Sequence, residues 1–116
     1  MASAGDPVEK LLKRLAAEIE AQGIRVDMMY LFGSRVGREA RADSDIDVAV
    51  ISPDFRGAAM PIWIQVMRTC FRVDPRIEPV LYAPEEFRDE EPLAWEIKRT
   101  GRQIVLAPPP LVTEAN

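Results

Sequence analysis

The sequence has no histidine and only one cysteine, Cys70, among its 116 residues. The lack of histidine excludes catalysis by Ser–His or Cys–His pairs, histidine zinc ligands and proton transfer through an imidazole. A single cysteine excludes an internal disulfide, and we expect Cys70 to be a small buried side chain of the core. Any acid–base or metal chemistry must therefore depend on carboxylates.

Long apolar runs and an excess of basic charge are absent too. No stretch approaches the roughly 20 apolar residues that a membrane-spanning helix needs. Residues 1–7 lack the charged and apolar segments of a signal peptide. We therefore expect a cytoplasmic protein without a membrane association. The formal net charge of −4 argues against direct DNA binding through a general basic surface.

The length and composition fit one globular domain. Hydrophobic residues make up 47% of the chain and charged residues 29%, which is ordinary for a globular protein. A chain of this length has no room for two domains, and we expect residues 1–106 to form a single one. Three consecutive prolines at 108–110 prevent regular structure, so we expect residues 107–116 to be a flexible tail.

Helical and strand patterns alternate along the chain. Apolar residues at spacings of three and four predict helices, and compact apolar segments predict strands. Helix-separated strands indicate an α+β fold, with a small mixed sheet of about four strands flanked by helices. The expected segments are 7–22, 62–71 and 92–100 for helices, 24–32, 45–51 and 77–82 for strands, 104–106 for a short strand or extended segment, and 34–39 and 84–87 for short helices or turns.

Several side chains have expected places in this arrangement. We expect Trp63 to be in the core. In the last helix we expect Leu93, Ile97 and either Trp95 or Ala94 to face inward. Pro79 lies inside the third expected strand and cannot donate a ladder hydrogen bond. That strand should therefore be short, bulged or near an edge of the sheet.

Two acids, Asp45 and Asp47, begin the second expected strand. Residues i and i+2 of a strand point to the same face, so both carboxylates project together while Ile46 and Val48 point into the core. Two like charges about 4 Å apart repel by about 4 kcal/mol at an effective dielectric near 20, and no Lys or Arg lies within the strand to compensate. Oxygen ligands of this kind suit Mg²⁺, and such a pair can hold two ions. The alternative is a polar turn followed by an exposed strand acid.

A Gly-Ser pair precedes these acids at the end of the first expected strand. Gly33 lets the backbone approach a phosphate closely, and a helix that starts at Ser34 offers N–H groups to an anion. The alternative is an ordinary strand-to-helix turn with Ser34 as N-cap. Arg35, Arg38 and Arg41 recur every three residues, which places them on one face, either beside a triphosphate or in solvent.

Gly33-Ser34, ten further residues and then Asp45-x-Asp47 resemble the signature of the DNA polymerase β-type nucleotidyltransferase superfamily. The stretch Phe-Gly-Ser-Arg…Ser-Asp-Ile-Asp-Val-Ala-Val is similar to its minimal nucleotidyltransferase (MNT) branch, as is the segment that begins at Pro92. The resemblance implies a palm-like fold, ATP as substrate and Mg²⁺ at the acids.

The resemblance also implies a third catalytic and metal-binding carboxylate on a later strand. Here the candidate is Glu78, where most MNT members have aspartate; the alternative is an exposed strand acid. Gly33, Ser34, Arg35 and Arg38 would then bind the phosphates. Many members show Arg then Gly where this chain has Gly then Arg38.

Members of the MNT branch commonly pair with a helical HEPN-domain ribonuclease. Such pairs behave as toxin–antitoxin modules. The resemblance implies that the MNT protein transfers AMP from ATP to a tyrosine of the HEPN toxin and that this modification silences the toxin. A second hypothesis is a non-catalytic antitoxin that covers its partner sterically. A third is a nucleotidyltransferase for a small molecule such as an aminoglycoside, for which a homo-oligomer would have to build the pocket.

Overall fold

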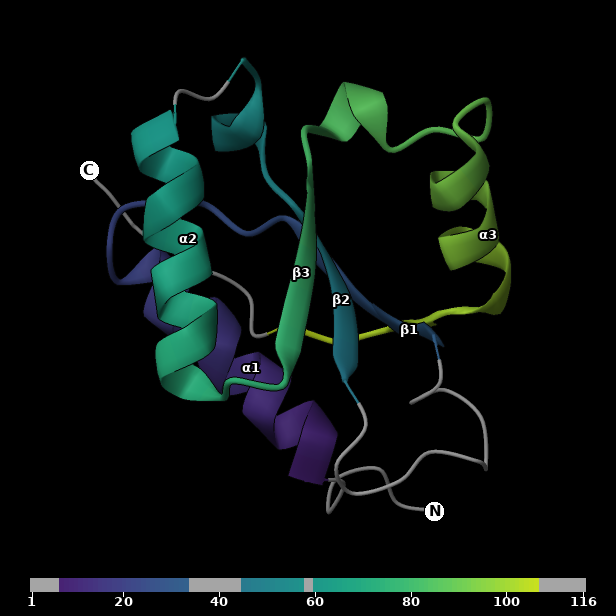
Figure 1. Ribbon diagram of the computed structural model, residues 1–116. Coiled ribbons are helices and arrows are strands. Elements are labelled where there is room, and N and C mark those ends of the chain that lie inside the picture. Colours follow the sequence, from purple (N-terminus) through teal and green to yellow (C-terminus); the bar gives the residue numbers. More distant parts are fainter. Residues whose placement is uncertain (1–6, 34–44, 58–59, 107–116) are drawn as a thin grey trace, which may run out of the picture.

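The computed structural model describes residues 7–33, 45–57 and 60–106. The described elements have the α+β composition that the sequence predicts (Figure 1). In chain order they are α1 (Pro7–Glu20), β1 (Met28–Phe32), β2 (Ile46–Ile51), the 3-10 helix η3 (Pro53–Phe55), α2 (Met60–Val73), β3 (Ile77–Tyr82), the 3-10 helix η4 (Pro84–Glu86), α3 (Pro92–Thr100) and β4 (Arg102–Gln103).

The four strands form one mixed sheet in the order β3-β2-β1-β4. β1 pairs antiparallel with β2 and β4, whereas β2 and β3 are parallel. β3 is therefore an edge strand. The presence of Pro79 predicted such a position, because the missing N–H of a proline is least costly in an edge strand. The parallel pairing also brings the first residues of β2 and β3 to the same end of the sheet.

Helices cover both faces of the sheet: α1 and α2 lie on one side and α3 on the other (Figure 1). Burial of each large aliphatic side chain between these layers contributes about 1.5–3 kcal/mol. The first core includes Leu12, Leu15 and Ile19 of α1, Val66 and Cys70 of α2, and Met29, Leu31, Ile46, Val48 and Val50 of the sheet. The second core consists of Ala49, Ile51, Tyr82, Phe87, Ala94 and Ile97.

Hydrogen bonds fix the start of α3. Glu91 is its N-cap, and one carboxylate oxygen accepts a hydrogen bond of 2.8 Å from the Ala94 N–H. The same oxygen accepts a second hydrogen bond of 2.9 Å from the Tyr82 hydroxyl, which ties α3 to the end of β3. Pro92 occupies the first turn, where its missing N–H costs nothing.

The prediction that Trp63 lies in the core is wrong, because 46% of it is exposed. The buried face of α2 runs instead through Val66, Thr69 and Cys70. Thr69 tolerates burial because its hydroxyl donates to the Gln65 carbonyl at 2.8 Å and accepts from a Gln22 amide at 2.6 Å. Thr69 is therefore part of the buried face of α2, and Trp63 lies at the border of that face.

The inward positions of α3 were predicted only in part. Ala94 and Ile97 are buried, but Leu93 and Trp95 are exposed. The last strand is also earlier than expected, at Arg102–Gln103 instead of 104–106. Its position follows from Gly101, where a Cβ would lie 3.0 Å from a β1 carbonyl, so the chain joins the sheet at once.

The first strand starts later than expected. β1 begins at Met28, although the preceding Ile24 and Val26 are buried as expected. Residues 34–39 and the tail 107–116 lie outside the described residues. Among the helices that are described, none combines the length and apolar character needed to cross a membrane.

Candidate functional site

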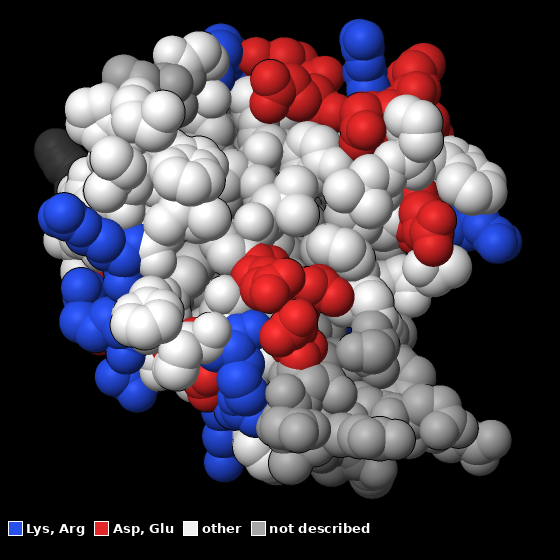
Figure 2. Space-filling model, viewed as in Figure 1, with Lys and Arg blue, Asp and Glu red and all other residues white. Residues whose placement is uncertain are grey.

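The predicted carboxylates come together at the end of the sheet where β2 and β3 begin. In the β2–β3 register Asp47 lies directly opposite Glu78, and Asp45 immediately precedes β2. Ile46 and Ile77 are buried in the first core, so Asp47 and Glu78 point to the other face, the side of α3. Figure 2 shows acidic side chains gathered over this part of the molecule, next to the residues drawn in grey.

These carboxylates repel one another. Burial, and next the charge of Asp45, raise the pKa of Asp47 above its ordinary value. The charge of Asp45 is the main cause that raises the pKa of Glu78, followed by desolvation, a hydrogen bond with Asp45 and the charge of Asp47. The negative charge gathered around Asp47 and Glu78 therefore favours the binding of a proton or a cation there.

Within the described chain, no basic side chain forms an ion pair with the three acids. The ion pairs between described residues leave out Asp45, Asp47 and Glu78. Arg76 lies just before β3, and its carbonyl accepts a 2.8 Å hydrogen bond from the Ile46 N–H. Its guanidinium, however, donates to both carboxylate oxygens of Asp74, at 3.0 and 2.7 Å.

Gly33 lies against Asp47. It directly follows β1, whose last residue, Phe32, is the register partner of Asp47. Its φ is +76°, in the left-handed region, and a Cβ built there would overlap Asp47 Oδ2 and lie 3.2 Å from Cγ. Only glycine fits both the backbone angle and the space. The glycine of the Gly-Ser pair and the second acid of the Asp-x-Asp pair are therefore neighbours.

The predicted phosphate-binding residues Ser34, Arg35 and Arg38 lie outside the described residues, as does Arg41. Their roles stay predictions. The structure thus brings together Gly33 and the acids of β2 and β3.

The donor set fits a hard divalent cation, because it consists of carboxylate oxygens whose charges are not neutralised within the cluster. No group of three or more His, Cys, Asp or Glu side chains in the described ranges is already arranged as a metal site. The carboxylates therefore share one end of the sheet without forming a closed ligand shell, and their assignment to Mg²⁺ stays a prediction.

The sequence did not predict that Phe32 lies next to the acids. Phe32 is partly buried on the α3 side of the sheet, opposite Asp47. Together with Tyr30 and Val80 it borders the acids with an apolar surface. Residues 28–32 are all apolar, so the sequence contains no alternation that would have singled out Phe32, and their register with β2 is a property of the folded sheet.

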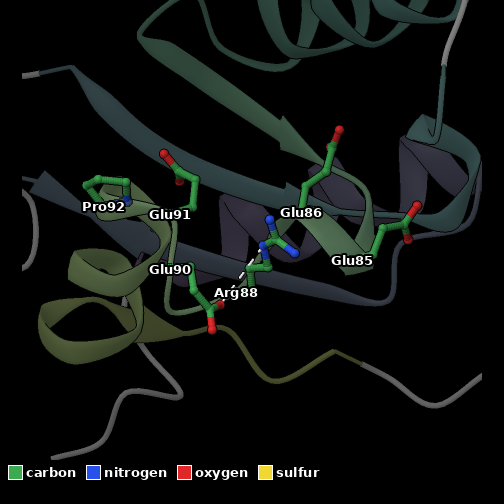
Figure 3. A pocket seen from close by; sticks show the side chains of 6 residues that line it. All are labelled: Glu85, Glu86, Arg88, Glu90, Glu91 and Pro92. Carbon is green, nitrogen blue, oxygen red and sulfur yellow. Dashed lines mark ion pairs between the residues drawn. The ribbon is translucent and has the colours of Figure 1, made fainter.

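A second acidic region lies at the other end of β3 and differs from the site. It is a hollow of about 490 Å³ lined by residues of η4 and the loop to α3 (Figure 3). Its carboxylates have partners: Glu85 binds Arg56, Glu86 accepts from the Ala83 N–H, and Glu91 caps α3. These bonds hold η4 and α3 in place, so the hollow has a structural explanation.

Comparisons with known proteins agree with this description. A family model described as "Polymerase beta, Nucleotidyltransferase" matches residues 13–107. The fold is similar to a crystal structure from Sulfolobus solfataricus that is provisionally described as a nucleotidyltransferase. The TM-score is 0.55 at 16% sequence identity, over 82% of this chain and 77% of that chain. At this identity the likeness concerns the fold alone. No significant match was found among curated proteins.

Proposed function

The chain belongs to the polymerase beta nucleotidyltransferase family, and on that premise we propose that it transfers AMP from ATP to a hydroxyl group. The observation that carries this proposal is the position of Gly33 against Asp47, with Glu78 opposite Asp47 on the adjacent strand. Gly33 and Asp47 belong to the two pairs whose spacing resembles the nucleotidyltransferase signature, and Glu78 is the candidate for the third carboxylate that the resemblance implies.

Asp45, Asp47 and Glu78 would hold Mg²⁺. When bound, the metal would neutralise phosphate charge and help to align the triphosphate. Gly33 leaves room for a phosphate beside the backbone because no Cβ occupies that space. Glu78 is exposed and its pKa is raised, so it is suited to orient the acceptor hydroxyl and take its proton. The acceptor oxygen then forms a bond to the α-phosphorus, the bond to the β-phosphate oxygen breaks, and pyrophosphate leaves.

We further propose that the acceptor is a tyrosine of a partner HEPN ribonuclease, which this protein silences as an antitoxin. The similarity of the stretch from Phe32 to Val50 to the MNT branch supports this choice. A cytoplasmic location, a flexible segment at 107–116 and a homo-oligomer stay predictions.

The test is incubation of the purified protein with α-labelled ATP, Mg²⁺ and a co-encoded HEPN protein. Wild type should label the partner and lower its ribonuclease activity, and Asp47→Asn should do neither. Glu20→Gln, which removes an exposed carboxylate from α1, is the matched control and should behave as wild type. No label with wild type, or equal label with Asp47→Asn, rejects the transferase. Undiminished silencing by Asp47→Asn without label identifies steric inhibition instead.

A further inference from the structure

Helix α2 carries large apolar side chains on its exposed side. Met60 is 64% exposed, Ile64 38% and Phe71 70%, and Trp63 borders them. Met60, Ile64, Met67 and Phe71 follow one another at spacings of four, three and four, so they form one line along the helix. We call Met60, Trp63, Ile64, Met67 and Phe71 the α2 stripe. Apolar side chains exposed singly are ordinary, whereas a continuous row is typical of an interaction surface.

The charged residues that α2 itself places beside the stripe are all basic. The charged residues of α2 are Arg68 and Arg72, with no acid in the helix. Both line a hollow of about 560 Å³ that also touches Ile64 of the stripe. Arg72 contacts Glu18 at 3.6 Å, but both side chains are largely exposed, so this ion pair is weak. Arg68 has no ion pair with another described residue.

We propose that the α2 stripe is a docking surface for an amphipathic helix of a partner protein, with acidic residues beside its apolar face. The stripe spans twelve residues, or about 16 Å of helix between its first and last Cα atoms, which suits a second helix with anchors at i, i+3, i+4 and i+7. Arg68 and Arg72 complement acids on that helix and lie in a protein whose net charge is −4.

Charge also argues against a second copy of this chain as the occupant. A twofold interface brings the same patch of both subunits together. Two α2 stripes would face each other with Arg68 and Arg72 on both sides, and α2 has no acid to answer them. A partner that supplies carboxylates removes this repulsion.

The stripe ends close to the catalytic end of the sheet. Phe71 lies in the last turn of α2, and β3 begins at Ile77, one residue before Glu78. A partner helix on the stripe would therefore lie at the same end of the sheet as the carboxylates, although on the opposite face. Binding of a partner helix to the stripe does not depend on AMP transfer. The idea that this binding presents an acceptor to the site rests on the proposed function.

The test uses two fluorescent helical peptides with leucine at the anchor positions, bordered in one by glutamate and in the other by lysine. Fluorescence anisotropy should show that wild type binds the acidic peptide at least about tenfold more tightly than the basic one. The double variant Arg68→Glu, Arg72→Glu should reverse this preference. Phe71→Ser should weaken binding of the acidic peptide by about tenfold.

Two controls separate docking from other effects. Val105→Ser removes another highly exposed apolar side chain, 71% exposed and outside α2, and should leave binding unchanged. Asp47→Asn should also bind the acidic peptide as wild type does, so failure of the transferase would not affect this result. Equal affinity for both peptides, no binding of the acidic peptide, or full binding by Phe71→Ser overturns the proposal. A dimer in analytical ultracentrifugation that Phe71→Ser dissociates would assign the stripe to a second copy instead.

Discussion

Substitution of Gly33 by alanine should damage the site more than it damages the fold. Gly33 has a φ of +76°, and an L-residue in the left-handed region costs about 1–2 kcal/mol. The new Cβ also overlaps a carboxylate oxygen of Asp47, which must turn away. An off-rotamer side chain adds about 0.5–1.5 kcal/mol, so the free energy of unfolding should fall by about 1.5–3.5 kcal/mol. At about 4 °C per kcal/mol, the Tm should fall by about 6–14 °C.

The loss of Mg·ATP binding should be larger than the loss of stability suggests, because the displaced group, the Asp47 carboxylate, is a proposed metal ligand. A change that misplaces a ligand typically costs about 10–100-fold in metal affinity. The affinity of Gly33→Ala for Mg·ATP should therefore fall at least about tenfold at a temperature where the variant is still folded. Calorimetric titration gives the affinity, and thermal melts give the stability.

Gly23→Ala is the matched control. Gly23 also has a positive φ, +88°, but a Cβ there meets nothing within 4 Å. Gly23→Ala should lose stability through backbone strain alone, about 1–2 kcal/mol, and should bind Mg·ATP as wild type does. The reasoning is refuted if Gly33→Ala keeps wild-type affinity, or if the two variants lose affinity equally.

Three further results are expected. Because the charge of Asp45 raises the pKa of Glu78 above its ordinary 4.5, the unfolding free energy should fall as the pH rises through that raised pKa. Glu78→Gln should therefore raise the Tm near pH 7 in EDTA and change it little near pH 3. A lower Tm of this variant near pH 7 would contradict the prediction. Tyr82→Phe removes the 2.9 Å hydrogen bond to Glu91 and should cost about 1 kcal/mol in urea denaturation, whereas an unchanged midpoint would show that the bond contributes nothing. Burial raises the pKa of the Cys70 thiol to about 12, so a thiol reagent should label it in denaturant only, and rapid labelling of the native protein would show that this side of α2 opens.

Local signals in the sequence predicted several element bounds. α3 runs from Pro92 to Thr100 as expected, because a proline starts it and a glycine follows it. β3 likewise matches its predicted range. The error at Trp63 has a different origin, since apolar periodicity ranks tryptophan above threonine as a core residue. The hydrogen bonds that make Thr69 a good buried residue involve Gln22 of another helix, and no local pattern contains them.

In the candidate site, too, local patterns predicted some features, and others depend on contacts between distant parts of the chain. That Asp45 and Asp47 share a face depends only on the period of a strand. The position of Glu78 opposite Asp47 depends on parallel pairing between two strands that α2 separates in the chain. Resemblance to a family suggested Glu78, and the fold supplies its register. The contact of Gly33 with Asp47 follows in the same way from the β1–β2 pairing.

The central claim is that the carboxylates at the start of β2 and β3 hold magnesium beneath a nucleoside triphosphate. Isothermal titration of ATP into the protein, with and without Mg²⁺, tests it most directly. We expect saturable uptake by wild type that requires Mg²⁺ and disappears in the double variant Asp45→Asn, Asp47→Asn, although that variant melts at a temperature at least as high. Absence of uptake by wild type, or the same uptake by the double variant, would contradict the claim.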